Sequence, residues 1–221
     1  MNRGEQTKKS HKPRDAGRSR DAILSAAGDL FAEKGFDGVS LNEIAADAGL
    51  SRGTPSYFFG SKADLYVAVL ERAFEERERA TRRACEPLLS WASSQGGDSI
   101  RGALTDAVTG YLEFLLGHPV FLKLILREEI AGASRLRSVS RESKAIEEAF
   151  EAVRSVATDR GLQPFDVKEA VLVFVSLTFF PAAQRSTFMA SLGRDLEDAA
   201  THKQQVELVV TQLLCLLVVP R

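Results

Sequence analysis

The sequence has 221 residues, of which 44% are hydrophobic and 27% charged, and its formal net charge is −1 at pH 7. This composition is ordinary for a globular protein, and the length allows one small domain plus one larger core. The charge is uneven, because residues 1–20 carry about +5, which leaves about −6 for the remainder. Such a basic arm suits contact with a polyanion at one end of the molecule, and it equally suits a solvated tail.

Several classes of protein are excluded at this stage. The only two cysteines, Cys85 and Cys215, have no metal-ligand spacing, so we expect no metal site, no disulfide framework and a cytoplasmic location. The N-terminus has no apolar segment after its charges, which argues against a secretory signal. The apolar runs at 170–183 and 206–219 are shorter than the roughly 20 residues that a membrane span needs. We interpret both runs as buried helices.

The first predicted helix covers residues 19–34. Ile23, Ala27 and Phe31 recur at helical spacing, and Gly35 ends the helix. A second helix begins after Ser40, because the S-x-x-E pattern formed with Glu43 is a capping box.

This second helix is short, and a third follows it closely. Gly49 ends the second helix, since glycine accepts the positive φ of a helix C-terminus. Ser51 then offers a new N-cap. Two short helices joined by a tight turn form a DNA-reading unit, whose second helix enters the major groove.

These residues resemble the N-terminal domain of TetR/AcrR-type transcriptional regulators. The matching segments are LFAEKGF (30–36), IAADAGLS (44–51), RGT (52–54) and YFFGSKADL (57–65). The resemblance covers the first third of the chain. It implies a flexible basic arm (1–18), a helix-turn-helix DNA-binding domain (19–66) and a helical ligand-binding and dimerisation domain (67–221).

The resemblance also implies a set of DNA contacts. Arg52 is placed to read a guanine edge and Thr54 a thymine methyl or a phosphate. Phosphate contacts are expected from Ser40, Tyr57 and Lys62, while Phe59 is assigned to the core. The full predicted DNA-binding set is Ser40, Arg52, Gly53, Thr54, Ser56, Tyr57, Phe58 and Lys62.

Two residues depart from the common pattern of the family: Pro55 stands at a usual leucine position and Ser56 at a usual tyrosine position. Proline disfavours helical geometry at the preceding residue, so the third helix is expected to begin irregularly or about one turn late.

The rest of the chain predicts further helices and no sheet. Ser61 and Asp64 repeat the capping pattern and begin a fourth helix, whose charged stretch at 75–83 is expected to be exposed. Later helices are predicted at 99–117, 120–130, 146–157, 166–184 and 202–219, with a loop at 93–98 and a break at 132–134. The fold class is therefore all-α with about nine helices.

Aromatic residues are frequent in the second half, and core packing is their simplest explanation. The family's cavity among the middle helices favours a pocket instead, and a kink at Pro181 would open space there. The predicted pocket residues are Tyr111, Phe114, Phe121, Arg127, Phe150, Phe174, Ser176 and Thr178. Because this lining is mostly apolar, we expect an apolar effector and no cofactor. Glu128 and Glu129 are interpreted as solvated charges.

The last two helices are predicted to form a homodimer interface, with an apolar stripe of Val206, Val210, Leu213, Leu214 and Leu217. The function that follows is a DNA-binding transcriptional regulator, a repressor released from a palindromic operator by an effector. A helical module that binds a protein partner through its apolar C-terminal helices is the alternative. Enzymatic activity is not expected, because no catalytic motif is found and the three histidines are not close to a nucleophile in sequence.

Overall fold

The computed structural model describes residues 13–94, 99–139 and 144–218. All regular structure in these ranges is helical, which confirms the predicted all-α class. The α-helices are α1 (Pro13–Lys34), α2 (Leu41–Asp47), α3 (Thr54–Phe59), α4 (Lys62–Ser93), α5 (Ile100–Gly117), α6 (Pro119–Ile130), α7 (Lys144–Ser155), α8 (Val167–Ala183) and α9 (Ala199–Leu217). The chain divides into two compact units, and the boundary between Leu70 and Glu71 falls within α4.

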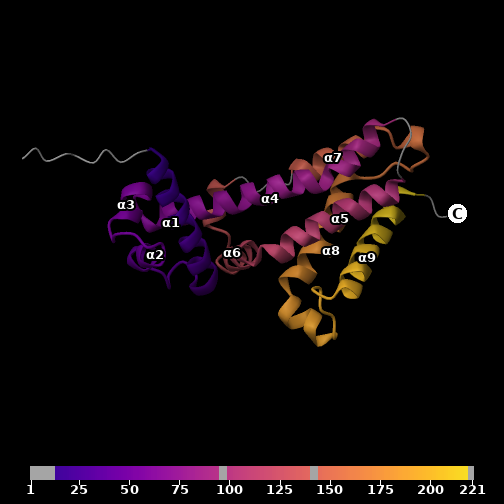
Figure 1. Ribbon diagram of the computed structural model, residues 1–221. Coiled ribbons are helices and arrows are strands. Elements are labelled where there is room, and N and C mark those ends of the chain that lie inside the picture. The colour runs from indigo at the N-terminus through magenta and orange to yellow at the C-terminus, as the bar shows by residue number, and fades with distance from the viewer. Residues whose placement is uncertain (1–12, 95–98, 140–143, 219–221) are drawn as a thin grey trace, which may run out of the picture. The chain divides into compact units, whose positions relative to one another are not determined.

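In the first unit α1 packs against α2 and α3 (Figure 1). Its core is apolar and includes a cluster of aromatic rings. The ring of Tyr66 makes edge-to-face contacts with Phe31 and Phe36, at 4.8 Å and 5.3 Å between ring centres. Helix α1 begins at Pro13, earlier than the predicted residue 19. Proline suits the first helical position and Asp15 complements the positive end of the helix, so residues 13–18 are helical and not part of a flexible arm. The other arm residues, 1–12, lie outside the described ranges.

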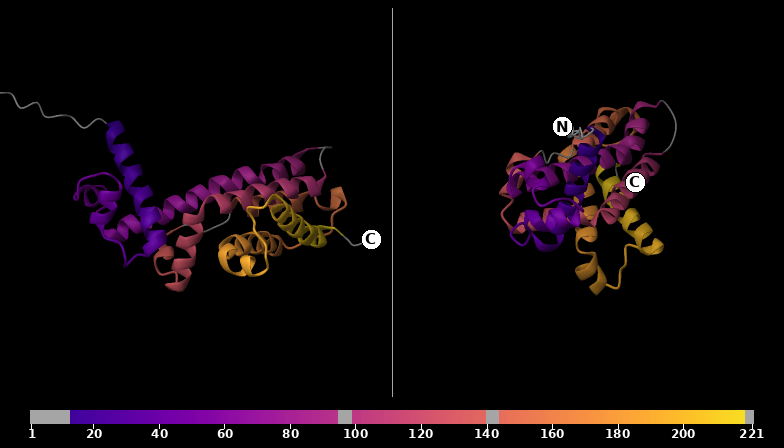
Figure 2. Two further views of the ribbon diagram at one scale, coloured as in Figure 1. Left: turned by 60° about the horizontal axis from the view of Figure 1, so that its bottom comes forward. Right: turned by 60° about the vertical axis from the view of Figure 1, so that its left-hand side comes forward.

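In the second unit α5, α8 and α9 pack against one another, and α7 packs on α8 (Figures 1 and 2). Helix α4 lies close to α5 at Gly110, where an added Cβ would come within 3.1 Å of the Ala84 Cβ. Phe74 of α4 meets Phe121 of α6 edge-on at 5.7 Å. These contacts build the interior in which the predicted pocket residues are found.

The charged stretch at 75–83 is not fully exposed, contrary to the prediction. Arg77, Ala80 and Thr81 are buried. The carboxylate of Glu78 accepts a hydrogen bond from the Ala145 amide at 3.0 Å and so fixes the start of α7 against α4. Periodicity alone missed this face because its buried members include polar residues.

The connection between α8 and α9 contains a π-helix, η3 (Arg185–Met189), which directly follows the helix that holds Pro181. Helix α9 begins at Ala199, a few residues before the predicted start, because Asp198 caps it by accepting from the Thr201 amide at 2.8 Å. No single helix in the described ranges has the length and apolarity to cross a membrane. The pair α5 and α6, bent by 80°, meets that test by length and composition alone.

Candidate functional site

The entry to α2 is fixed by the predicted capping box. The Ser40 hydroxyl accepts from the Glu43 amide at 3.2 Å, and the Ser40 amide donates to the Glu43 carboxylate at 2.8 Å. The hydrogen bond from the Ser40 amide is the largest cause that lowers the pKa of Glu43 below its ordinary value. The Ser40 side chain is therefore already engaged within its own helix start.

The exit from α2 is a complete Schellman motif. Gly49 has φ +68°, its amide donates to the Ala46 carbonyl at 3.1 Å, and the Leu50 amide donates to the Ala45 carbonyl at 2.8 Å. This motif sets the tight turn that leads to α3. A Cβ at Gly49 would meet no neighbour, so the backbone conformation, not space, requires the glycine.

Helix α3 begins at Thr54, two residues later than a helix capped by Ser51 would begin, although Thr54, where Pro55 was expected to disfavour helical geometry, is itself helical. Gly53 is its N-cap and not Ser51, and Pro55 lies buried in the first turn. The Thr54 amide donates to the Ser51 carbonyl at 2.9 Å, and the Ser51 and Thr54 hydroxyls are 2.7 Å apart. A tight turn at 51–54 therefore replaces the first helical turn that Ser51 would have capped.

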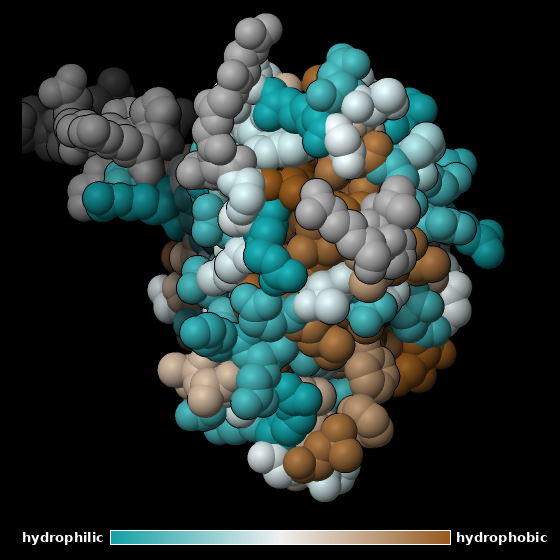
Figure 3. All heavy atoms as spheres, turned by 90° about the vertical axis from the view of Figure 1, so that its right-hand side faces the viewer, coloured by the Kyte–Doolittle hydropathy of each residue, from teal (hydrophilic) through white to brown (hydrophobic). Residues whose placement is uncertain are grey.

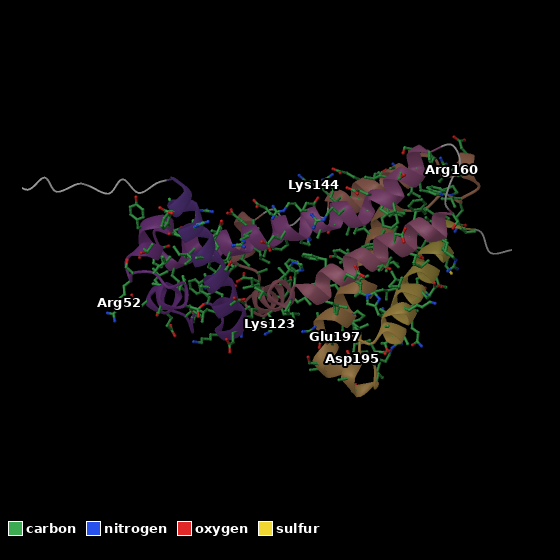
Figure 4. The ribbon with its side chains drawn as sticks, viewed as in Figure 1. Arg52, Lys123, Lys144, Arg160, Asp195 and Glu197 are labelled. Atoms are coloured by element: carbon green, nitrogen blue, oxygen red, sulfur yellow. The ribbon has the colours of Figure 1, made fainter. Side chains whose placement is uncertain are left out.

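The surface around the start of α3 is exposed and carries most of the predicted DNA contacts. The Arg52 side chain extends away from the ribbon of its unit (Figure 4), and Tyr57 is 84% exposed. Ser56 is also exposed, while Thr54 and Phe58 are half-buried. A groove of about 460 Å³ runs along this surface, lined by Ser19, Gly49, Leu50, Ser51, Gly53, Thr54, Tyr57 and Phe58.

Lys62 lies differently from the prediction. Its ammonium donates to the carbonyl oxygens of Phe36 and Val39, each at 3.0 Å, and lies 4.4 Å from the centre of the Phe36 ring. Two of its three N–H groups thus bind the backbone between α1 and α2. Lys62 acts first as an anchor of this loop, which leaves at most one donor for a phosphate.

Two residues of α1 join this surface although sequence reasoning did not select them. Ser19 lines the groove, and the guanidinium of Arg20 lies 4.9 Å from the centre of the Phe59 ring. Phe59 is half-buried, so its assignment to the core is only partly right. Both residues fall within the helix predicted at 19–34, but no local pattern indicated that the start of this helix lies beside α3.

Seven of the eight predicted pocket residues gather in or beside the interior of the second unit. Tyr111 lies 5.3 Å from Phe174 and 6.4 Å from Phe114 between ring centres, and Phe150 lies 6.1 Å from Phe174. Burial raises the pKa of Tyr111 to about 12, so its hydroxyl is neutral at physiological pH. Phe121 and Thr178 are buried and Arg127 is half-buried.

Two assignments in this unit are wrong. Ser176 is exposed, because it lies on the face of α8 opposite the buried Phe174 and Thr178. Glu128, interpreted as a solvated charge, is only 1% exposed, whereas its neighbour Glu129 is exposed. Adjacent helical residues point in different directions, and the sequence does not say which of the two faces inward.

The apolar stripe of α9 is already covered within the same chain. Val206, Val210, Leu213 and Leu217 are buried, Leu214 is half-buried, and α9 packs on α5 and α8. The argument that this stripe needs a second subunit is therefore wrong. The exposed apolar side chains of these two helices are others, namely Leu172 at 66%, Phe180 at 50% and Leu208 at 43% exposure.

A capped helix pair with an exposed second helix, followed by a larger helical unit, defines a helix-turn-helix DNA-binding protein. Residues 23–69 match the profile of bacterial regulatory proteins of the tetR family, and residues 101–212 match the tetracyclin repressor-like C-terminal domain. The chain belongs to the TetR family and is a DNA-binding transcriptional regulator, a role that does not depend on catalysis.

Individual relatives agree with this assignment. The HTH-type transcriptional repressor NicS of Pseudomonas putida is 27% identical over 202 residues, which cover 87% of this chain and 90% of NicS. The regulator RutR of Escherichia coli is 29% identical over 193 residues, covering 85% of each chain. A TetR-family structure from Mesorhizobium loti superposes with a TM-score of 0.69 at 21% identity, over 92% of this chain and 98% of that one.

Proposed function

We propose that this regulator is a cytoplasmic repressor that binds a two-fold symmetric operator and leaves it when a largely apolar effector binds. The name of NicS as a repressor and the usual behaviour of the family support this proposal. The observation that carries it is the exposed start of α3, where Arg52 and Tyr57 extend into solvent beside a groove. Tyr57 is 84% exposed, so its ring is accessible for contact with DNA.

In this proposal some of the exposed side chains recognise base edges and the others contact the phosphate backbone. Arg52 reads a guanine through O6 and N7, and Thr54 contacts a thymine methyl or a phosphate. The same DNA strand is contacted by Ser56, Tyr57, Phe58 and the Gly53 backbone. Ser40 contributes at the start of α2, although its hydroxyl already serves Glu43.

A comparison of two arginine substitutions tests the reading role. Arg52→Ala should reduce the preference for the operator over a scrambled duplex by about 1–3 kcal/mol, that is, about 5- to 150-fold. Arg83→Ala, which removes an exposed arginine from the second unit, should leave that preference unchanged. Equal operator preference in the Arg52→Ala variant and the wild type would remove Arg52 from base recognition.

The effector is proposed to bind among the rings of the second unit. Tyr111, Phe114, Phe121, Phe150 and Phe174 are already buried, so binding among them gains affinity from the effector's own apolar surface, at about 25 cal/mol per Å² removed from water. The neutral Tyr111 hydroxyl and Thr178 supply hydrogen bonds that select among ligands. Bound effector then favours a dimer geometry that no longer fits the spacing of the two half-sites.

We further propose that two copies associate through the outer faces of α8 and α9. Leu172, Phe180 and Leu208 are the exposed apolar residues there, and regulators of this family usually act as dimers. Leu172→Glu should give a folded monomer in sedimentation, because that side chain is 66% exposed in the single chain and a charge is tolerated there. Leu213→Glu should instead unfold the second unit, since Leu213 is fully buried. A Leu172→Glu variant that sediments as an unchanged dimer would place the interface elsewhere.

A further inference from the structure

Glu128 on α6 is an unusual buried carboxylate. Its side chain is 1% exposed, and its Oε2 atom has no hydrogen-bond partner. Its ion-pair partner in the described part of the chain is Arg135, whose Nη1 lies 3.8 Å from Oε1, beyond the range of an N–H···O hydrogen bond. Burial of a carboxylate is stable only when donors or positive charges surround it, and this set is incomplete.

The position of Glu128 along α6 connects it with the aromatic interior. Phe121, Leu124 and Glu128 are spaced three and four residues apart, and all three are buried, so they occupy one face of the helix. On that face Phe121 contacts Phe74 at 5.7 Å and Phe114 at 5.9 Å between ring centres. The carboxylate therefore lies at one end of an apolar, ring-rich face.

The end of α6 holds Glu128 in place. The Ala133 amide donates to the Glu128 carbonyl at 2.6 Å, and both Gly132 and Ala133 have positive φ. This turn leads into the 3-10 helix η1 (Arg135–Ser138) and brings Arg135 back toward the carboxylate. Arg135 is 31% exposed, so it lies between the buried carboxylate and solvent.

We infer that the effector is an amphipathic cation: an aromatic or aliphatic body that packs on these rings and a protonated amine that binds the Glu128 carboxylate. This inference rests on the proposed ligand-binding role of the second unit and names the class of ligand. An amine supplies the missing donors and the opposite charge at Glu128. The aromatic body packs on the Phe121 side of the cluster, because the Phe74 ring already has the guanidinium of Arg77 at 5.1 Å from its centre. A carboxylate ligand would face like-charge repulsion, and a neutral ligand would leave Arg135 at 3.8 Å as the positive charge beside Glu128.

Three probes with one body and different head groups test the inference: 4-phenylbutylamine, 4-phenylbutan-1-ol and 4-phenylbutanoate. Their affinities are measured by calorimetry at pH 7 for the full-length protein. We expect the amine to bind at least about tenfold more tightly than the alcohol, and the carboxylate to bind most weakly. Glu128→Gln should lower the affinity for the amine to the affinity for the alcohol. The exposed neighbour supplies the matched control, because Glu129→Gln should change none of the three affinities.

A second variant keeps the test decisive if Glu128→Gln does not fold. Arg135→Ala removes the competing cation, so it should strengthen amine binding several-fold and leave the alcohol unchanged. Three probes of equal affinity, an amine preference that survives Glu128→Gln, or no amine binding at millimolar concentration would overturn the inference. Operator binding is assayed separately. Amine binding through Glu128 in a protein that binds no duplex would overturn the proposed repressor function and leave this inference standing.

Discussion

Replacement of Lys62 by methionine tests whether this lysine stabilises the loop between α1 and α2 or contacts a DNA phosphate. Methionine keeps most of the apolar stem and removes the ammonium. In the wild type that ammonium donates to the carbonyls of Phe36 and Val39 at 3.0 Å and lies over the Phe36 ring. The substitution therefore leaves two backbone acceptors of the loop between α1 and α2 without their donor.

The expected loss of stability follows from these three contacts. A hydrogen bond from a charged group contributes about 1.5–3 kcal/mol, and a cation over a ring about 0.5–1 kcal/mol at an exposed site. Lys62 is half-buried, so solvent weakens each contribution. We expect Lys62→Met to destabilise the first unit by about 2–3 kcal/mol.

Hydrogen exchange locates this effect, because it reports stability segment by segment. Amides in residues 36–50 should exchange faster by about 30- to 150-fold in Lys62→Met, while amides of α5 and α9 stay unchanged. Lys34→Met is the matched control: its side chain is 44% exposed and its ammonium pairs with the exposed carboxylate of Glu43 at 3.4 Å, so exchange should change little. Unchanged protection in Lys62→Met together with weaker DNA binding would show that Lys62 is a phosphate contact alone.

Three further predictions concern other contacts. Ser40→Ala should lower the free energy of unfolding, measured by urea titration at pH 7, by about 1 kcal/mol. Because the pKa of Glu43 is lowered in the folded state, the capping box stabilises the fold above pH 4.5, and the difference between wild type and variant should shrink as the pH falls. Burial raises the pKa of Cys85 from 9.0 to about 12, so the thiol stays protonated in the folded state and the free energy of unfolding falls as the pH rises from 9 toward 12. Cys85→Ala should flatten this alkaline decline. An unchanged dependence of the free energy of unfolding on pH would refute the raised pKa of Cys85. Arg160 lies 4.7 Å from the Trp91 ring centre and donates to the carbonyls of Ala92, in the last turn of α4, and of Ser94, just after it. Arg160→Met should therefore shift the tryptophan emission, and identical spectra would count against this contact.

The sequence was sufficient where structure is set by neighbouring residues. The capping boxes at Ser40 and Ser61 and the Schellman turn at Gly49 each depend on a few consecutive residues. Side-chain oxygen, glycine and proline act on the adjacent backbone, and their effects are therefore readable from local sequence.

The sequence was insufficient where the partner lies far along the chain. Lys62 binds carbonyls that precede it by 26 and 23 residues, and no local pattern predicts that contact. Glu128 and Glu129 look alike in sequence, and only the packing of α6 decides which is buried. The stripe on α9 was identified correctly as a buried surface, but α5 and α8 of the same chain cover it. A hydrophobic pattern shows that a face is covered and does not show which element covers it.

The central claim is that the surface around α3 reads a two-fold symmetric duplex. Selection from a random duplex pool with the wild-type protein at low salt tests this claim most directly, followed by titration of the enriched duplex at increasing salt. We predict one enriched sequence with two inverted half-sites about one helical turn apart or a multiple of it, and an affinity that falls steeply as salt rises. Recovery of no enriched duplex at low salt, or enrichment that is identical for Arg52→Ala, would contradict the account.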